Sequence, residues 1–338
     1  MDCNKKMKQE LGQFYTVNAD KILKGIQRPP IGSRVVEPFA GQGDLLEWLG
    51  SGYATEAYDI DPKALGVVQR NTLHDPPNYT DAWVLTNPPY YARNKASDKS
   101  LYDRYATNDL YKCFLCSLGT QALGGVLIIP AGFFMSPRAG DVRVRAQFLS
   151  TYQCVRINYF EEQVFPDTTT AVVAIGFVRA PSTLVAQDIP WFRYPQGDTR
   201  TFQIRASHRW IVGGDIYDLP TAPDVRIRRW VEGMELAEGE ETTALLLCAL
   251  DGPGRIRLEV RPGFCYPAKD TSRTYATLVI RGRTLDADAQ TTLATRFNQY
   301  VDTHRDATWS LFLPHFREEG RKRMPFDLAY CLVLHLLL

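Results

Sequence analysis

The sequence predicts an α/β fold for its first half, in which helices cover both faces of a mostly parallel sheet, followed by a mixed α+β domain. Two observations support this prediction. Apolar, strand-like runs alternate with stretches of helical spacing up to about residue 180, the pattern of a parallel sheet. Beyond Ala180 the alternation fades, and prolines and glycines become frequent. We therefore divide the 338 residues into domains at 1–180 and 181–338.

The first elements flank a glycine-containing turn. Residues 33–39 are a β-branched run and form the first predicted strand. Residues 43–50 have helical spacing, and Asp44 is a suitable N-cap for that helix. Residues 54–61 are the next predicted strand. Residues 62–71 are expected to form its helix, since a proline at the start suits a first helical turn.

The remaining elements of the first half continue the alternation. Residues 81–89 are a predicted strand and 108–123 a predicted helix, which two glycines then end. Residues 126–134 are a continuous apolar run, as expected of a buried strand. Residues 154–160 and 169–180 complete the set, and the second has the apolar density of a sheet interior.

Composition describes an ordinary globular protein. The chain is 45% hydrophobic and 23% charged, with a formal net charge of +1. Bulk charge therefore gives no support for a nucleic-acid partner, although a basic stripe would escape this count. The polar first ten residues predict no secretory signal, and the apolar ending 331–338 is expected to dock on the core. We expect a soluble protein of the cytoplasm, or of the nucleus in a eukaryotic host or virus.

The cysteines predict neither a disulfide framework nor a metal site. Their number is seven, and they are scattered over a long chain. Cys113 and Cys116 form a C-x-x-C pair within a helical stretch, but no second pair or histidine is near enough to complete a zinc site. We interpret both as buried core thiols and expect no metal.

The turn between the first strand and helix is a candidate ligand site. Gly41 and Gly43 allow the backbone to approach a ligand or to turn tightly. A third glycine at the dinucleotide spacing is missing, so a bound pyrophosphate is not required. Asp59 ends the next strand, where its carboxylate can accept both hydrogen bonds of a ribose diol. A tight turn beside a solvated acid explains these two features equally well.

The segment Asn87-Pro88-Pro89-Tyr90 favours ligand binding over that alternative. The prolines fix their own φ angles and restrict Asn87 to an extended shape. Because they cannot donate ladder hydrogen bonds, the segment must leave the sheet at its carboxyl end, where ligands bind in open α/β sheets. Acceptor oxygens beside an aromatic ring suit a planar nitrogen substrate. A strand-end turn is the plain alternative.

In order along residues 10–180, the chain resembles the S-adenosylmethionine-dependent N6-adenine DNA methyltransferases whose cofactor motifs precede a C-terminal target-recognition region. The matching segments are GQFYT, VVEPFAGQGDLL, AYDIDPKAL, TNPPY, DLYKCFL, GGVLIIPAGFF and VFPDTTTAVVAIGF. The resemblance implies a class I methyltransferase-like (Rossmann-like) fold, S-adenosyl-L-methionine as cofactor and double-stranded DNA as substrate. It also implies a flipped-out adenine and a restriction-modification role, with a restriction endonuclease as a candidate partner and a monomer on DNA.

The same resemblance assigns residues to the site. Those assigned to the cofactor are Phe14, Tyr15, Thr16, Glu37, Phe39, Gly41, Gly43, Asp59, Ile60, Asn71 and Asn87. Those assigned to the target base are Asn87, Pro88, Pro89, Tyr90 and Phe165. Within the cofactor set, Asp59 would hold the ribose hydroxyls and Ile60 would pack against the adenine. Asn71 stands where the family often has an acidic residue for the adenine amino group; its oxygen can accept the same bond, and Asp75 is a fallback.

Arginines predict the role of the second domain. The basic residues after Ala180 are almost entirely arginine, in the segments 225–230, 255–261, 273–283 and 317–323. Arginine suits phosphate forks and guanine edges, as a target-recognition domain requires. Solvated faces offset by the acidic run 232–241 are the alternative interpretation.

Two further functions remain open from the sequence. Methyltransferases that act on protein glutamines or on RNA bases also use N-P-P-Y, because they face the same planar nitrogen. The GQFYT segment and the arginines of the second half favour DNA over these substrates. The second alternative is a DNA-binding homologue without activity. The intact motif, together with Gly41, Gly43 and Asp59, argues against it.

Overall fold

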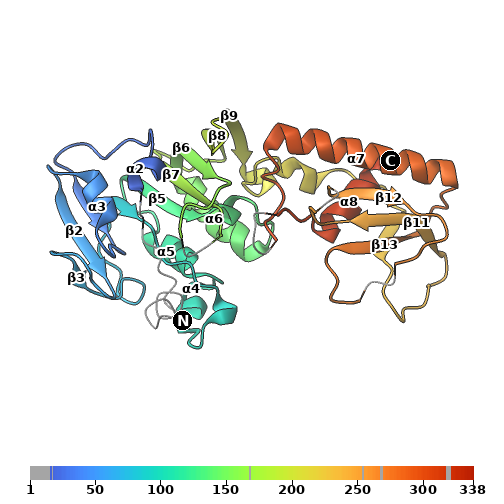
Figure 1. Ribbon diagram of the computed structural model, residues 1–338, viewed down its shortest axis with the longest axis horizontal. Helices are drawn as coiled ribbons and strands as arrows, with labels where there is room; N and C mark the ends of the chain where they lie inside the picture. The colour runs from blue at the N-terminus through green and yellow to red at the C-terminus, as the bar shows by residue number, and fades with distance from the viewer. Residues whose placement is uncertain (1–15, 17, 167–168, 253–254, 267–268, 317–320) are drawn as a thin grey trace. The chain divides into compact units, whose positions relative to one another are not determined.

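The computed structural model describes residues 16 and 18–338, apart from 167–168, 253–254, 267–268 and 317–320. The chain forms two compact units, Met1–Trp210 and Ile211–Leu338, each with its own sheet (Figure 1). The boundary predicted at residue 180 is therefore wrong. Strands β8 (Ala186–Tyr194) and β9 (Thr199–Arg205) cause the difference, because β8 pairs in parallel with the sheet of the first unit and β9 pairs with β8.

The described residues of the first unit form a nine-stranded sheet in the order β3-β2-β1-β4-β5-β7-β6-β8-β9. Its other strands are β1 (Arg34–Glu37), β2 (Ala54–Asp59), β3 (Val68–Gln69), β4 (Trp83–Thr86), β5 (Gly124–Pro130), β6 (Tyr152–Phe160) and β7 (Val172–Arg179). The neighbouring strands of the run β3-β2-β1-β4-β5 pair in parallel, whereas β7 is antiparallel to both of its neighbours. The predicted α/β fold with a mostly parallel sheet is confirmed.

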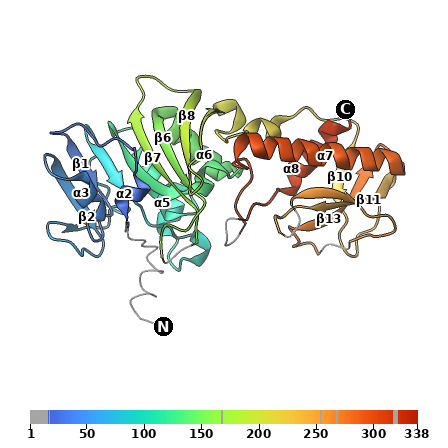
Figure 2. The ribbon, with the colours of Figure 1, turned by 45° about the horizontal axis from the view of Figure 1, so that its top comes forward.

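Helices cover both faces of this sheet, as Figures 1 and 2 show. The helices of the unit are α2 (Ala19–Ile22), α3 (Asp44–Leu49), α4 (Ser100–Tyr105), α5 (Leu110–Leu118) and α6 (Ala139–Thr151). Val35 of β1 and Ile128 of β5 pack in one cluster with the buried residues of α2 and α3. Successive strand side chains alternate between faces, so Phe177 of β7 lies on the opposite face from Ala174. There its ring contacts Phe148 of α6, with the centroids 5.2 Å apart.

The helix predicted over residues 62–71 is absent. That segment is irregular and contains only the two-residue strand β3. Leu65 and Val68 are exposed, and Gly66 has a φ of +83°. A short helix needs a buried apolar face, and this segment buries none. Asp44 is the first residue of the helix α3 and not its predicted N-cap, because Gly43 occupies the N-cap position.

The second unit has the predicted mixed α+β structure. Its described strands pair antiparallel in the order β10-β13-β11-β12. They are β10 (Arg226–Arg229), β11 (Glu240–Cys248), β12 (Arg257–Val260) and β13 (Tyr275–Arg281), with the helices α7 (Ala287–Thr308) and α8 (Phe326–Leu336). One core cluster joins Leu247 and Ile280 of the sheet with Phe297 of α7 and Leu332 of α8. The apolar C-terminal segment therefore forms a helix docked on the core, as predicted.

The cysteine prediction is half right. Cys113 is fully buried, and burial raises the pKa of its thiol to about 11. Cys116 is only half-buried, so it is not a core thiol. The described part of the chain has no group of three side chains that could hold a metal ion. Within the same part, the helices are too short or too polar to span a bilayer.

Candidate active site

The carboxyl ends of three neighbouring strands bring the predicted residues together. Strands β2, β1 and β4 are adjacent and parallel, so their carboxyl ends share one edge of the sheet. Glu37 is the last residue of β1, Asp59 is the last residue of β2, and Asn87 directly follows β4. Ligands of open α/β sheets bind at such an edge.

Asp59 shapes the glycine turn. Its Oδ2 accepts the N–H of Gly41 at 2.8 Å, and its Oδ1 accepts the N–H of Asp61 at 2.8 Å. Gly41 and Gly43 have φ values of +52° and +87°, which other residues rarely adopt. These two bonds fix the carboxylate of Asp59 at the carboxyl end of β2. The ribose role of Asp59 stays a prediction.

Glu37 is a buried acidic residue at this edge of the sheet. Its side chain is 1% exposed, and its Oε2 has no hydrogen-bond partner among the described residues. Burial raises the pKa of Glu37 well above its usual value, and the nearby carboxylates of Asp44 and Asp59 raise it further. An unpaired buried carboxylate is costly, so a cationic ligand group beside it would be favoured. The residues at this edge therefore fit a ligand that carries an ammonium or sulfonium group.

The amide of Asn87 is held from both ends. Its Nδ2 donates to Thr16 Oγ1 at 3.1 Å, and its Oδ1 accepts the hydroxyl of Tyr90 at 2.5 Å. The same hydroxyl lies 2.9 Å from the carbonyl oxygen of Ile128. One proton thus has two acceptors. The ring of Tyr90 is half-buried, edge-on to Tyr111 at 6.2 Å between centroids.

The other residues assigned to the base lie nearby. Pro88 is buried and Pro89 half-buried in the segment that leaves β4. Phe165 is 1% exposed and belongs to the core cluster against which Tyr90 packs. It therefore meets a base only if side chains at this edge move, and its role stays a prediction.

For three residues assigned to the cofactor, the described part of the structure shows no ligand-facing role. Phe14 and Tyr15 lie outside the described residues. The Oδ1 of Asn71 accepts the backbone N–H groups of Leu73 and His74 at 3.2 and 3.3 Å, so this oxygen already caps a local turn.

The remaining candidates differ in exposure. Ile60 is 42% exposed just beyond β2, which leaves its side chain available to a ligand ring. Phe39 is half-buried and lies edge-on to Phe114 of α5, with the centroids 5.5 Å apart. Asp75, the fallback, is 77% exposed and pairs with Arg70 at 3.0 Å.

Asp109 is a site residue to which the sequence analysis gave no role. It occupies the N-cap position of α5, and its Oδ1 accepts the N–H of Tyr91 at 3.1 Å. It thereby holds the residue that follows the N-P-P-Y segment. Burial raises the pKa of Asp109 to about 6, against the lowering effect of Lys112. The signal in the sequence was an aspartate directly before a helical run, which predicts a cap but not this partner.

The raised pKa of Asp109 predicts a pH-dependent stability. The folded protein holds this proton more tightly than the unfolded chain, whose aspartates titrate near 3.9. The free energy of unfolding should therefore fall by about 3 kcal/mol in total as the pH rises from roughly 3 to 7, and should stay constant above that. Asp109→Asn keeps an acceptor for Tyr91 and should remove this fall. Urea unfolding of both proteins at several pH values measures it, and parallel curves would contradict the assignment.

Asp59→Ala should weaken binding of the cofactor named above. The loss should be about 1.5–3 kcal/mol, the scale of hydrogen bonds to a charged group. Asp61→Ala is the matched control, because Asp61 is an exposed neighbouring carboxylate that pairs with Lys63. Calorimetric titration with S-adenosyl-L-methionine compares the two variants, and DNA binding without cofactor should change little. Equal affinities in wild type and Asp59→Ala would remove Asp59 from the site.

In the second unit, several of the predicted arginines are engaged within the unit. Five of them form ion pairs with acids of the same unit, and Arg305, outside the predicted segments, forms a sixth: Arg228, Arg229, Arg255, Arg257, Arg261 and Arg305. From Ile211 to Leu338 the sequence has 14 arginines and two lysines against 18 acidic residues, a formal net charge of −2. This unit is therefore no basic platform by bulk charge.

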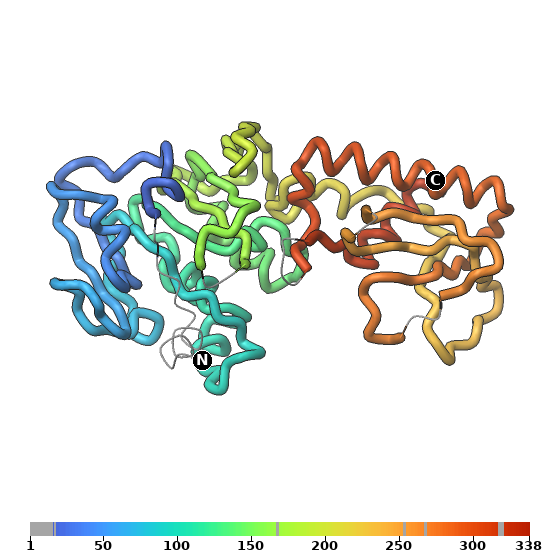
Figure 3. Tube along the Cα trace, viewed as in Figure 1, coloured from blue at the N-terminus to red at the C-terminus, as the bar shows by residue number. Residues whose placement is uncertain are grey.

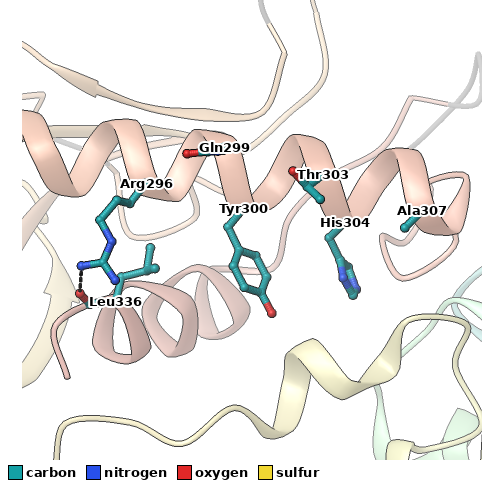
Figure 4. A pocket seen from close by; sticks show the side chains of 7 residues that line it. All are labelled: Arg296, Gln299, Tyr300, Thr303, His304, Ala307 and Leu336. Atoms are coloured by element: carbon teal, nitrogen blue, oxygen red, sulfur yellow. Dashed lines mark hydrogen bonds between the residues drawn. The ribbon is translucent and has the colours of Figure 1, made fainter.

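The second unit also has a pocket of about 460 Å³ along α7 (Figure 4). Tyr300 and His304 stack there at 6.0 Å, and His304 Nε2 lies 2.8 Å from the carbonyl oxygen of Gly213. Arg296 donates to the carbonyl oxygen of Leu336 in α8 at 3.0 Å. These polar groups already have partners within the unit, so the catalytic assignments stay with the first unit.

Comparisons with known proteins find likeness in structure. No protein-family model matches the chain, and no curated protein matches it. A structure of a type I restriction-modification system is 17% identical, with a TM-score of 0.43 over 58% of this chain and 50% of that one. The type I EcoKI M protein is 13% identical, with a TM-score of 0.41 over 56% and 50%. A type I methyltransferase subunit from Streptococcus thermophilus is 12% identical, with a TM-score of 0.38 over 55% and 49%.

The chain thus spans about half the length of these matched structures. Its activity must be inferred from its own residues.

Proposed function

We propose that the protein is a site-specific DNA methyltransferase that transfers a methyl group from S-adenosyl-L-methionine to N6 of a flipped-out adenine. The observation that carries this proposal is the placement of the Asn87 amide. It is fixed by Thr16 and Tyr90 at the end of β4, at the same sheet edge as the buried carboxyl of Glu37, whose Oε2 has no hydrogen-bond partner among the described residues. The Glu37 side of the site thus suits a cationic group of the cofactor, and the Asn87 side suits the amine of the base.

The cofactor would be held by residues of β1, β2 and the turn between them. Glu37 fits the ammonium group of the methionine portion, because its Oε2 is buried without a described partner. Asp59 places a carboxylate at the end of β2 for the ribose, and Ile60 is exposed beside it for the adenine. When bound, the cofactor supplies an electrophilic methyl group on a sulfonium.

Asn87 and the Pro88 carbonyl would prepare the adenine amine. That amine is a poor nucleophile because its lone pair is delocalised into the ring. If the Asn87 Oδ1 and the Pro88 carbonyl each accept one amine hydrogen, the nitrogen becomes more tetrahedral and its lone pair turns toward the methyl group. Positioning and preorganised dipoles would supply most of the acceleration.

Tyr90 would release the acceptor that the amine needs. In the structure its hydroxyl lies within hydrogen-bond distance of both Asn87 Oδ1 and the Ile128 carbonyl. An incoming amine can therefore take the Asn87 oxygen while the tyrosine proton turns to Ile128. No buried hydroxyl is left without a partner by this exchange, which keeps its cost low.

The base must leave the duplex to reach this edge of the sheet, at a cost of a few kcal/mol that stacking on Tyr90 would offset. We further propose that the second unit recognises the target sequence and that the protein serves restriction-modification. The resemblance of residues 10–180 to the adenine-specific family supports this choice of substrate over RNA or protein.

Methyl transfer from labelled cofactor to duplex DNA, RNA and protein, measured in parallel, tests the proposal. We expect label in DNA alone. Label in RNA or protein but not in DNA would replace the proposed substrate. Cofactor binding without transfer to any of the three would identify a binding protein without activity.

A further inference from the structure

The chain between the N-P-P-Y segment and α5 forms a closed lobe. We define the lobe as residues 91–109, which include α4 (Figure 3). Its two ends pair antiparallel, with a bridge between Ala92 and Asp109 and a hydrogen bond of 2.9 Å from the N–H of Arg93 to the Asn108 carbonyl. The N–H of Leu110 also donates to the Tyr91 carbonyl at 3.2 Å. The lobe is therefore attached directly to the candidate catalytic segment.

The lobe is also anchored on its sides. Tyr105 Oη donates to the carbonyl oxygen of Leu73 at 3.0 Å, and Arg104 donates to the carbonyl oxygen of His74 at 2.8 Å. Arg143 of α6 donates to the carbonyl oxygens of Tyr105 and Ala106 at 2.9 and 2.8 Å. Contacts on three sides make the lobe a fixed platform and not a loose loop.

The outer surface of the lobe is basic. Between residues 93 and 105 there are four basic residues and two acidic ones. Arg93 pairs with Asp103 at 2.8 Å, whereas Lys95 and Lys99 are exposed and form no ion pair with any described residue. The hydroxyl of Tyr91 donates to the Lys95 carbonyl at 2.8 Å. This bond ties the backbone of Lys95 to Tyr91, the residue that directly follows the N-P-P-Y segment.

We propose that this lobe binds the phosphate backbone of duplex DNA beside the flipped-out nucleotide, through Lys95 and Lys99. The inference rests on the proposed function and adds the surface that holds the substrate. Phosphate contacts position a duplex and supply most of its salt-dependent affinity. The second unit has a net negative charge, and six of its arginines already have acidic partners, so free cations beside the catalytic segment are well suited to this task.

The test is the salt dependence of DNA binding by the full chain carrying Lys95→Gln and Lys99→Gln. Each lost phosphate contact lowers the slope of log affinity against log salt by about 0.9, so the double variant should lose roughly two. The affinity should fall equally for duplexes with and without the target sequence, because backbone contacts carry no sequence information. At saturating DNA the methylation rate should stay at the wild-type value, while KM rises.

Two controls separate this surface from general charge. Lys95→Arg with Lys99→Arg keeps both cations and should keep the wild-type slope. Lys24→Gln removes one exposed cation outside the lobe and should leave the slope unchanged. The backbone of Lys24 is held at β6, where its carbonyl accepts a hydrogen bond from Asn158 Nδ2 at 3.0 Å.

The outcomes distinguish the two proposals. If the wild-type chain methylates DNA but the Gln double variant keeps the wild-type slope, the lobe is not the phosphate surface and the proposed function stands. A Lys24→Gln variant with the same loss per lysine would also overturn the lobe assignment. If the wild-type chain neither binds nor methylates DNA, the proposed function fails, and this inference fails with it.

Discussion

Asn87→Ala should lower the methylation rate by roughly 10²–10³, the scale for loss of one preorganised hydrogen bond in a transition state. The substitution removes one of the two acceptors that shape the amine. It leaves the prolines and Tyr90 in place, so the fold and the cofactor pocket should survive. DNA binding should fall much less than the rate. Single-turnover methylation of an unmethylated duplex that contains the target sequence measures the effect.

Asn87→Asp is the matched control for this prediction. It keeps an oxygen acceptor at the same position but replaces the Nδ2 donor, which bonds Thr16 at 3.1 Å, with a second, negatively charged oxygen. It should therefore retain more of the rate than the alanine variant. A wild-type rate in Asn87→Ala would reduce Asn87 to a strand-end turn residue.

Tyr90→Ala should reduce both the methylation rate and the binding of a duplex with an extruded base. A lost stacking platform costs about 1–3 kcal/mol per base, at every stage in which the base is held outside the helix. A duplex with an abasic position at the target adenine has no base to stack, so its affinity should not change. The comparison of these two duplexes isolates stacking from other contacts.

Tyr90→Phe separates the ring from the hydroxyl. The hydroxyl lies 2.5 Å from Asn87 Oδ1 and 2.9 Å from the Ile128 carbonyl, so its loss frees the acceptor but leaves Ile128 without this donor. We expect Tyr90→Phe to keep most of the stacking and far more activity than Tyr90→Ala. Equal losses in the two variants would show that the hydroxyl, not the ring, matters.

The sequence predicted the parts of the fold in which local pattern and tertiary packing agree. The apolar run predicted as a strand over residues 126–134 is a buried strand up to Pro130, where composition alone identifies it, whereas Ala131–Phe134 form a short 3-10 helix. The segment 62–71 has local helix signals, yet no core lies beneath Leu65, so the helix does not form. Strands β8 and β9 were missed because Pro190 lies inside β8 and most of β9 is exposed, so neither strand has a continuous apolar run.

The candidate site was predictable in its members but not in their contacts. Spacing placed Asp59 and Asn87 at strand ends, and the family resemblance assigned Glu37 to the cofactor. Parallel pairing of the strands brings all three to one edge. The use of Asn71 Oδ1 in its own turn could not be read from the residue type. Asp109 was missed because its partner, the N–H of Tyr91, is far from it in sequence and close only through the closure of the lobe.

Nucleoside analysis of methylated DNA tests the central claim most directly. The purified chain is incubated with unmethylated genomic DNA and S-adenosyl-L-methionine that carries a labelled methyl group. The DNA is then digested to nucleosides, and a parallel sample is sequenced to map modified positions. We predict label in N6-methyladenine alone, at one short sequence context, and far less label after the same short incubation with Asn87→Ala. Label in a cytosine, or no label in DNA while the protein binds the cofactor, would contradict the account.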